Sequence, residues 1–154
     1  MIASCGGYPK DINVYQMQKT MDNAACAVRK GGVVILLAEC IEGSGSAKLE
    51  ETFRRLRTPE AIKKELEDNF QIGANKAFAI TRPLGKARFI LVTALNRDLA
   101  KSMHFTAAVD TVEEALKIAH EYLGGHPSTI MMPEGSLTVP RVAPEYNCSC
   151  KCGR

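Results

Sequence analysis

The chain has 154 residues and a formal net charge of +3, which results from 20 basic and 17 acidic side chains. This near balance, together with the absence of tryptophan, argues against a surface that binds nucleic acid. Hydrophobic residues make up 45% and charged residues 24% of the chain, as in one soluble globular domain with its own core. The sequence has no apolar run long enough to span a membrane and no secretion leader, so we expect no membrane contact and a cytoplasmic location.

Strands and helices are expected to alternate along the chain. Apolar runs bounded by glycines or polar turns predict strands at 2–5, 33–38, 88–95 and 129–132. Helical spacing of apolar residues predicts helices at 14–28, 49–56, 59–70, 74–80, 98–103 and 112–123. The second strand is continuously apolar and rich in β-branched residues, which is typical of a central parallel strand. We therefore expect an α/β fold, a three-layer α/β/α sandwich around a mainly parallel, Rossmann-like sheet.

The same pattern predicts the division of the chain and the buried positions of its later helices. The α/β domain is expected at 1–140, and 141–154 are expected to form an irregular, cysteine-rich tail. The first four residues resemble the end of a strand, so we expect a further portion of the protein upstream. The expected buried positions are Ile62, Leu66 and Phe70 in one helix, and Val112, Leu116, Ala119 and Leu123 in the last one.

Two glycine-rich loops follow predicted strands. Gly6 and Gly7 permit positive φ angles and close approach of a ligand, and Gly43 and Gly45 follow the second strand in the same way. Loops at the carboxyl ends of parallel strands lie at one edge of the sheet, where α/β proteins bind ligands. We therefore expect both loops at that edge. They match no nucleotide-binding glycine pattern, and glycine used only for turning explains the second loop equally well.

The helix after the first loop has one apolar and one polar face. Asn13 followed by Gln16 resembles a capping box, which predicts that the helix begins at Val14. The polar face contains Tyr15, Gln16, Lys19 and Asn23. Because the first turn of a helix offers unpaired amides and the positive end of its dipole, an anion is expected to bind there next to Lys19. The alternative is an ordinary solvated helix face.

Several short motifs are concentrated in the first third of the chain. They are Gly6-Gly7-Tyr8-Pro9, Asp11, Asn13, Tyr15-Gln16 with Lys19, Gly31-Gly32 and Glu42-Gly43-Ser44-Gly45, followed more loosely by the run from Phe70 to Ala77. With these motifs the chain resembles the C-terminal domain of the nickel-dependent lactate racemase family. The resemblance implies a 2-hydroxy-acid racemase or epimerase, an isomerase that passes a hydride between its substrate and a nickel-pincer nucleotide.

The resemblance also implies the roles of individual residues at a cleft between two domains. Gln16 and Lys19 are expected to be catalytic, and the substrate-binding residues are expected to be Tyr15, Gly6, Gly7 and Asp11. The groups that hold the nickel and the cofactor belong to a preceding N-terminal domain, in the same gene or in a separate chain. We therefore expect no metal ligand in this chain and no activity from the chain alone. Cys5, Lys10 and Ser44 replace the asparagine, leucine and histidine usual in lactate-specific members, which leaves the 2-hydroxy acid open.

The histidines and cysteines support two other functions more weakly. The three histidines, at 104, 120 and 126, lie in different predicted elements and lack metal-ligand spacing. Cys5, at a helix entrance, is a candidate nucleophile if its pKa is lowered, whereas Cys26 and Cys40 are expected to be core thiols. Cys148, Cys150 and Cys152 form a Cys-x-Cys-x-Cys tail. The alternatives are thus a stand-alone Rossmann-like module for a nucleotide or other anion, and a redox or metal-handling protein.

Overall fold

The structure is a computed structural model that describes residues 1–68 and 72–141. The strands are β1 (Ile2–Ser4), β2 (Val33–Leu37), β3 (Arg88–Val92), β4 (Ala107–Val109) and β5 (Met131–Met132). The helices are α1 (Val14–Ala27), α2 (Ala47–Arg55), α3 (Pro59–Asp68), α4 (Ile72–Leu84), α5 (Arg97–Ser102) and α6 (Val112–Leu123). The predictions for Phe70 and for the cysteines of the tail lie outside the described residues.

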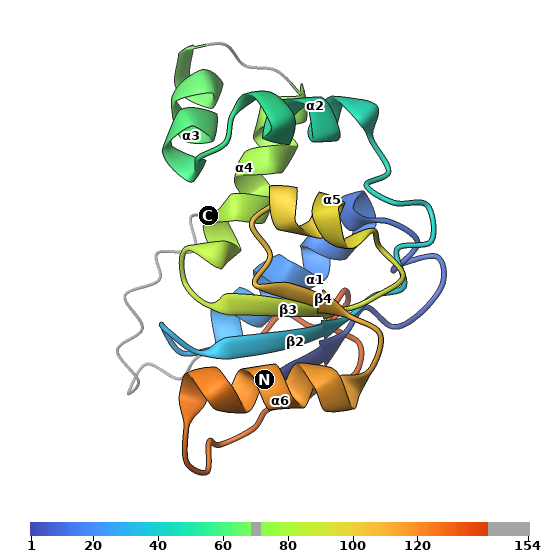
Figure 1. Cartoon of the computed structure of the whole chain (residues 1–154), viewed down its shortest axis with the longest axis vertical. Helices are drawn as coiled ribbons and strands as arrows, with labels where there is room; N and C mark the ends of the chain where they lie inside the picture. Colours follow the sequence, from blue (N-terminus) through green and yellow to red (C-terminus); the bar gives the residue numbers. More distant parts are fainter. Residues whose placement is uncertain (69–71, 142–154) are drawn as a thin grey trace.

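The five strands form one parallel sheet in the order β4-β3-β2-β1-β5. The α6 helix contacts β2, β3 and β4 from one face, and α1, α4 and α5 lie on the other (Figure 1). The predicted α/β/α sandwich is therefore confirmed, with one of its helical layers reduced to a single helix among the described residues. Since the chain proceeds from β1 outward to β4 and returns to the other side of β1 at β5, its direction of winding changes next to β1.

The central strand β2 buries side chains on both of its faces, as its apolar run predicts. Val34 and Leu36 belong to the larger core cluster between the sheet and α1, α2, α4 and α5. Val33 and Ile35 belong to a smaller cluster beneath α6. Each of these four side chains is at most 2% exposed, so β2 anchors both halves of the core.

The fold differs from the sequence predictions at β4 and at α6. The strand β4 was not predicted, because three residues are too few for a recognisable apolar pattern, although Ala107 pairs with Ile90 of β3. In α6, Leu116 and Leu123 are each 38% exposed, whereas Ala115 and Ala119 are buried. The small alanine side chains let α6 lie close to the sheet, which turns the leucines toward the helix flank.

Candidate functional site

The two glycine-rich loops meet at the carboxyl edge of the sheet, as the parallel topology predicts. The first loop follows β1 and the second follows β2. Their backbones are joined where Cys40 N donates to Asp11 O at 2.8 Å and Glu42 N donates to Ile12 O at 2.9 Å. The loops therefore form one continuous wall at the edge where α/β proteins bind their ligands.

The second loop caps the start of α1. Asn13 is the N-cap, and its side chain accepts a hydrogen bond from Gln16 N at 3.0 Å. Val14 N donates to Gly43 O, and Tyr15 N donates to the carbonyl oxygen of the next loop residue, both at 3.1 Å. The expectation that these first-turn amides stay unpaired is thus wrong. They hold the glycine loop, so an anion at this end of α1 relies on side chains.

The exposed face of the first turns of α1 presents a lysine and a glutamine as a pair. Lys19 Nζ donates to Gln16 Oε1 at 3.1 Å. Tyr15 lies next to them on the helix and is 36% exposed. The opposite face is fully buried at Val14 and Met17, so the core fixes the helix while the polar pair stays accessible.

A residue that sequence analysis left without a role, Lys76 of α4, completes this cluster. Its ammonium lies 4.0 Å from the centroid of the Tyr15 ring and donates to Gln18 Oε1 at 2.7 Å. Partial burial, followed by the charge of Lys19, lowers the pKa of Lys76, and Asp22 opposes this effect. Lys76 falls within the run of residues 70–77 that resembles the racemase family, but only the packing of α4 against α1 brings it here.

Gly6, Gly7 and Asp11 lie on another part of the same wall. Gly6 and Gly7 have φ angles of +88° and +74°, which only glycine adopts readily. A Cβ atom on Gly6 would lie 3.3 Å from Lys10 Nζ and 3.9 Å from the Glu134 Cα atom. Asp11 is half-buried, and its charge contributes to the raised pKa values of two thiols beneath the loop. None of these contacts of Gly6 and Asp11 involves Gln16 or Lys19.

The segment after β5 closes this edge. Gly135 N donates to Ser4 O, and Ser136 Oγ donates to Cys5 O, both at 2.7 Å. Asn23 Nδ2 of α1 donates to Gly135 O at 2.7 Å. Asn23 therefore ties the helix to this segment, which corrects its assignment to the polar ligand-facing surface.

The buried thiols are unreactive. Burial raises the pKa of Cys5 to about 11 and that of Cys40 to about 12. The proposed lowering of the Cys5 pKa is therefore wrong, because the thiol lies beneath the loop without exposure to solvent. Burial disfavours the thiolate, so neither residue has the properties of a nucleophile.

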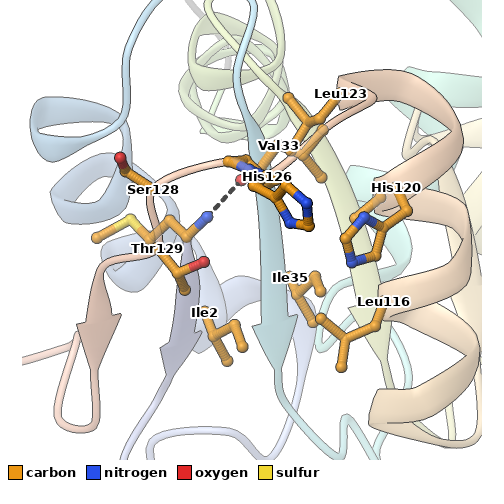
Figure 2. A pocket seen from close by; sticks show the side chains of 12 residues that line it. Ile2, Val33, Ile35, Leu116, His120, Leu123, His126, Ser128 and Thr129 are labelled. Carbon is orange, nitrogen blue, oxygen red and sulfur yellow. Dashed lines mark hydrogen bonds between the residues drawn. The ribbon is translucent and has the colours of Figure 1, made fainter.

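Two histidines that are separate in the sequence line one pocket on the other side of the sheet. His120 of α6 and His126 of the following loop lie on a cavity of about 240 Å³ whose wall includes Ile35 and Leu116 (Figure 2). His104 instead makes an edge contact with the Phe53 ring at 5.9 Å between centroids. Within 1–68 and 72–141, no three His, Cys, Asp or Glu residues are grouped as a metal site requires.

None of the helices in the described ranges is long and apolar enough to cross a membrane.

Comparison with known proteins gives one consistent result. The family model of the lactate racemase C-terminal domain matches residues 1–139. A lactate racemase of Thermoanaerobacterium thermosaccharolyticum is 32% identical over 146 residues, which cover 92% of this chain and 34% of that protein. A lactate racemase of Lactiplantibacillus plantarum is 29% identical over 142 residues, covering 87% of this chain and 32% of that protein.

The fold agrees with these matches. The solved structure of the lactate racemase apoprotein from Thermoanaerobacterium thermosaccharolyticum superimposes with a TM-score of 0.84 at 32% identity, over 92% of this chain and 35% of that one. The chain thus spans about a third of the length of its relatives. Because the family model covers nearly the whole chain, the chain belongs to the lactate racemase C-terminal domain family.

Proposed function

We propose that this chain is the substrate-side domain of a 2-hydroxy-acid racemase or epimerase. The observation that carries the proposal is the pair formed by Gln16 and Lys19, whose side chains are 3.1 Å apart on the first turns of α1. Because Gln16 Oε1 accepts from Lys19, its Nε2 amide group keeps both donors for a ligand. A substrate carboxylate at this position accepts hydrogen bonds from the ammonium and from the amide, which are the strong, charge-assisted kind.

Lys19 and Gln16 are the catalytic residues of this proposal because they touch the substrate and hold its carboxylate. Tyr15 lies between Lys19 and Lys76 and provides an aromatic contact for the carbon chain. The remaining wall of the cleft consists of Gly6, Gly7 and Asp11, and the absence of side chains at both glycines lets the backbone approach the substrate.

The cofactor and the metal are assigned to another domain. The described residues offer no group of three metal-ligating side chains, so they do not fit a nickel site of their own. The nickel-pincer nucleotide that the family resemblance implies, when bound by the N-terminal racemase domain, supplies the hydride acceptor. The residues of this chain bind and orient the acid. Cys5 and Cys40 form no disulfide in the described part of the chain, which fits the reducing cytoplasm where we place the enzyme.

The test combines this chain with the cofactor-loaded first two thirds of a relative and follows racemisation of several 2-hydroxy acids. Lys19→Ala and Gln16→Ala are each expected to reduce turnover by roughly ten- to a hundredfold, because each removes one charge-assisted contact. Both variants should keep the thermal midpoint of the wild type, since Lys19 is exposed and Gln16 belongs to neither hydrophobic core cluster.

The matched control is Lys117→Ala, which removes an exposed lysine from α6 on the opposite face of the sheet. It should change neither turnover nor stability. The chain alone, supplied with the cofactor, should be inactive. Full turnover of both the Lys19→Ala and the Gln16→Ala variants would show that the proposed site is wrong. Racemisation by the chain alone would instead refute the assignment of the cofactor to another domain.

A further inference from the structure

Two lysine ammonium groups flank Tyr15 where α1 contacts α4. On one side Lys19 Nζ donates to Gln16 Oε1 at 3.1 Å. On the other side Lys76 Nζ donates to Gln18 Oε1 at 2.7 Å and lies 4.0 Å from the centroid of the Tyr15 ring. Successive helix residues are turned by about 100°, so Tyr15 projects between Gln18 and Lys19 around α1. The site therefore contains two lysine and glutamine pairs that point in different directions.

In the described part of the chain no protein carboxylate forms an ion pair with either ammonium, although the charge of Asp22 acts on Lys76. The nearby carboxylate of Asp22 is engaged elsewhere, with Arg82 2.8 Å from its Oδ1 atom and the Gln18 amide donating to its Oδ2 atom. The ion pairs within 1–68 and 72–141 include neither Lys19 nor Lys76. Each ammonium has three donors and uses one of them on a glutamine. Two cations with spare donors thus flank the Tyr15 ring.

This arrangement has an electrostatic cost that an anion removes. Partial burial lowers the pKa of Lys76, and the charge of Lys19 lowers it further, while the charge of Asp22 raises it. A ligand with one negative group neutralises one of them. A ligand with two negative groups neutralises both, and each group meets an ammonium of its own.

We infer that the acid bound here carries a second acidic group, so that the substrate is a 2-hydroxy dicarboxylate rather than a monocarboxylate. The inference rests on the proposed function. The carboxylate next to the hydroxyl group binds Lys19 and Gln16, the second acidic group binds Lys76, and the carbon chain between them lies against Tyr15. Lys76 is thereby a specificity-determining residue, contributed by a helix that is far from α1 in the sequence.

The test is a binding measurement on the full ¹⁵N-labelled chain by NMR at constant ionic strength and neutral pH. The probes are 2-hydroxypropanoate, with one carboxylate, and 2-hydroxybutanedioate, with two. The dicarboxylate is expected to bind the wild type roughly tenfold tighter or more, because one added charge-assisted contact has about this effect. Lys76→Met should reduce the affinity for the dicarboxylate roughly tenfold and weaken monocarboxylate binding much less.

Three further variants test whether the effect of Lys76→Met on binding results from the lost charge, from the position of the lysine or from a loss of folding. Lys76→Arg keeps the charge and should keep the preference for the dicarboxylate. Lys117→Met, on the far face, should behave as the wild type. Lys19→Met should weaken the binding of both acids. The amide spectrum of each variant reports whether that variant is folded.

Equal binding of the two acids to the wild type would overturn the inference. So would a Lys76→Met variant that loses monocarboxylate binding as strongly as dicarboxylate binding, because one carboxylate would then bridge both lysines. Either result leaves the proposed function intact as long as binding depends on Lys19. If Lys19→Met changes the binding of neither acid, the proposed function fails. In that case a preference for the dicarboxylate that still depends on Lys76 would show that Lys76 binds an acidic group of the ligand. Absence of binding by either acid contradicts both proposals.

Discussion

The contact between Gly45 and the N-cap of α1 predicts how much one methyl group disturbs the site. A Cβ atom on Gly45 would lie 2.4 Å from Asn13 Cγ, closer than two such atoms approach in proteins, and the φ angle of Gly45 is +73°. In Gly45→Ala the left-handed backbone costs about 1–2 kcal/mol. Displacement of the Asn13 cap adds about 1 kcal/mol. The free energy of unfolding is therefore expected to fall by about 2–3 kcal/mol for Gly45→Ala.

Gly43 provides the matched control. Its φ angle is +66°, and a Cβ atom there would have no atom within 4 Å. Gly43→Ala should therefore cost only the backbone term, about 1–2 kcal/mol. Urea unfolding followed by circular dichroism measures both variants, and the difference between them isolates the contact with Asn13. Because Asn13 holds the first turn of α1, Gly45→Ala should also weaken acid binding at Lys19. Equal losses of stability in the two variants would refute this reasoning.

The remaining predictions concern the buried thiols and the two faces of the core. At pH 8 a thiol with a pKa of about 11 is ionised in only about one molecule in a thousand, so iodoacetamide should modify Cys5 and Cys40 only after unfolding. Both thiols have higher pKa values in the folded than in the unfolded chain, where the value is about 8.5. Their contribution to the free energy of unfolding is therefore fully present below about pH 8.5 and should decrease as the pH rises above it, which urea unfolding at several pH values measures. Early alkylation of Cys5 or Cys40 in the native chain, or flat stability above that pH, would contradict the burial of these two thiols. Leu36→Ala should cost about 2–5 kcal/mol, whereas Leu116→Ala should cost about 0.5 kcal/mol or less. Similar losses in the two variants would show that Leu116 is part of the core.

Local sequence determined much of the fold and part of the site. The continuous apolar run of β2 predicted a central parallel strand, and that strand is buried on both faces. Asn13 and Gln16 predicted the start of α1 at Val14, and the two glycine loops were expected at one sheet edge. These features follow from the periodic spacing of apolar residues and from helix caps and turns, which depend on only a few neighbouring residues.

The tertiary structure decided which partner each polar group at that edge of the sheet has. The amides of the first turn of α1 were expected to be unpaired, but carbonyl groups of the Gly43 loop accept from them. Asn23 has the spacing of a solvated residue, yet it holds the segment after β5. Cys5 stands at a helix entrance, yet burial raises its pKa. Each outcome depends on a partner that is distant in the sequence.

Lys76 shows the same limit for function. Nothing in its own helix predicts that its ammonium lies over Tyr15 and donates to Gln18, because α1 and α4 are separated by one strand and two helices in the chain. Sequence periodicity assigns a face to each helix but not the helix that lies opposite it. The sequence by itself therefore indicated the family, the alternation of strands and helices and the Lys19 face of α1. Only the packing of α4 against α1 brings a second cation to the Tyr15 ring, because a helix face meets its partner through tertiary contacts.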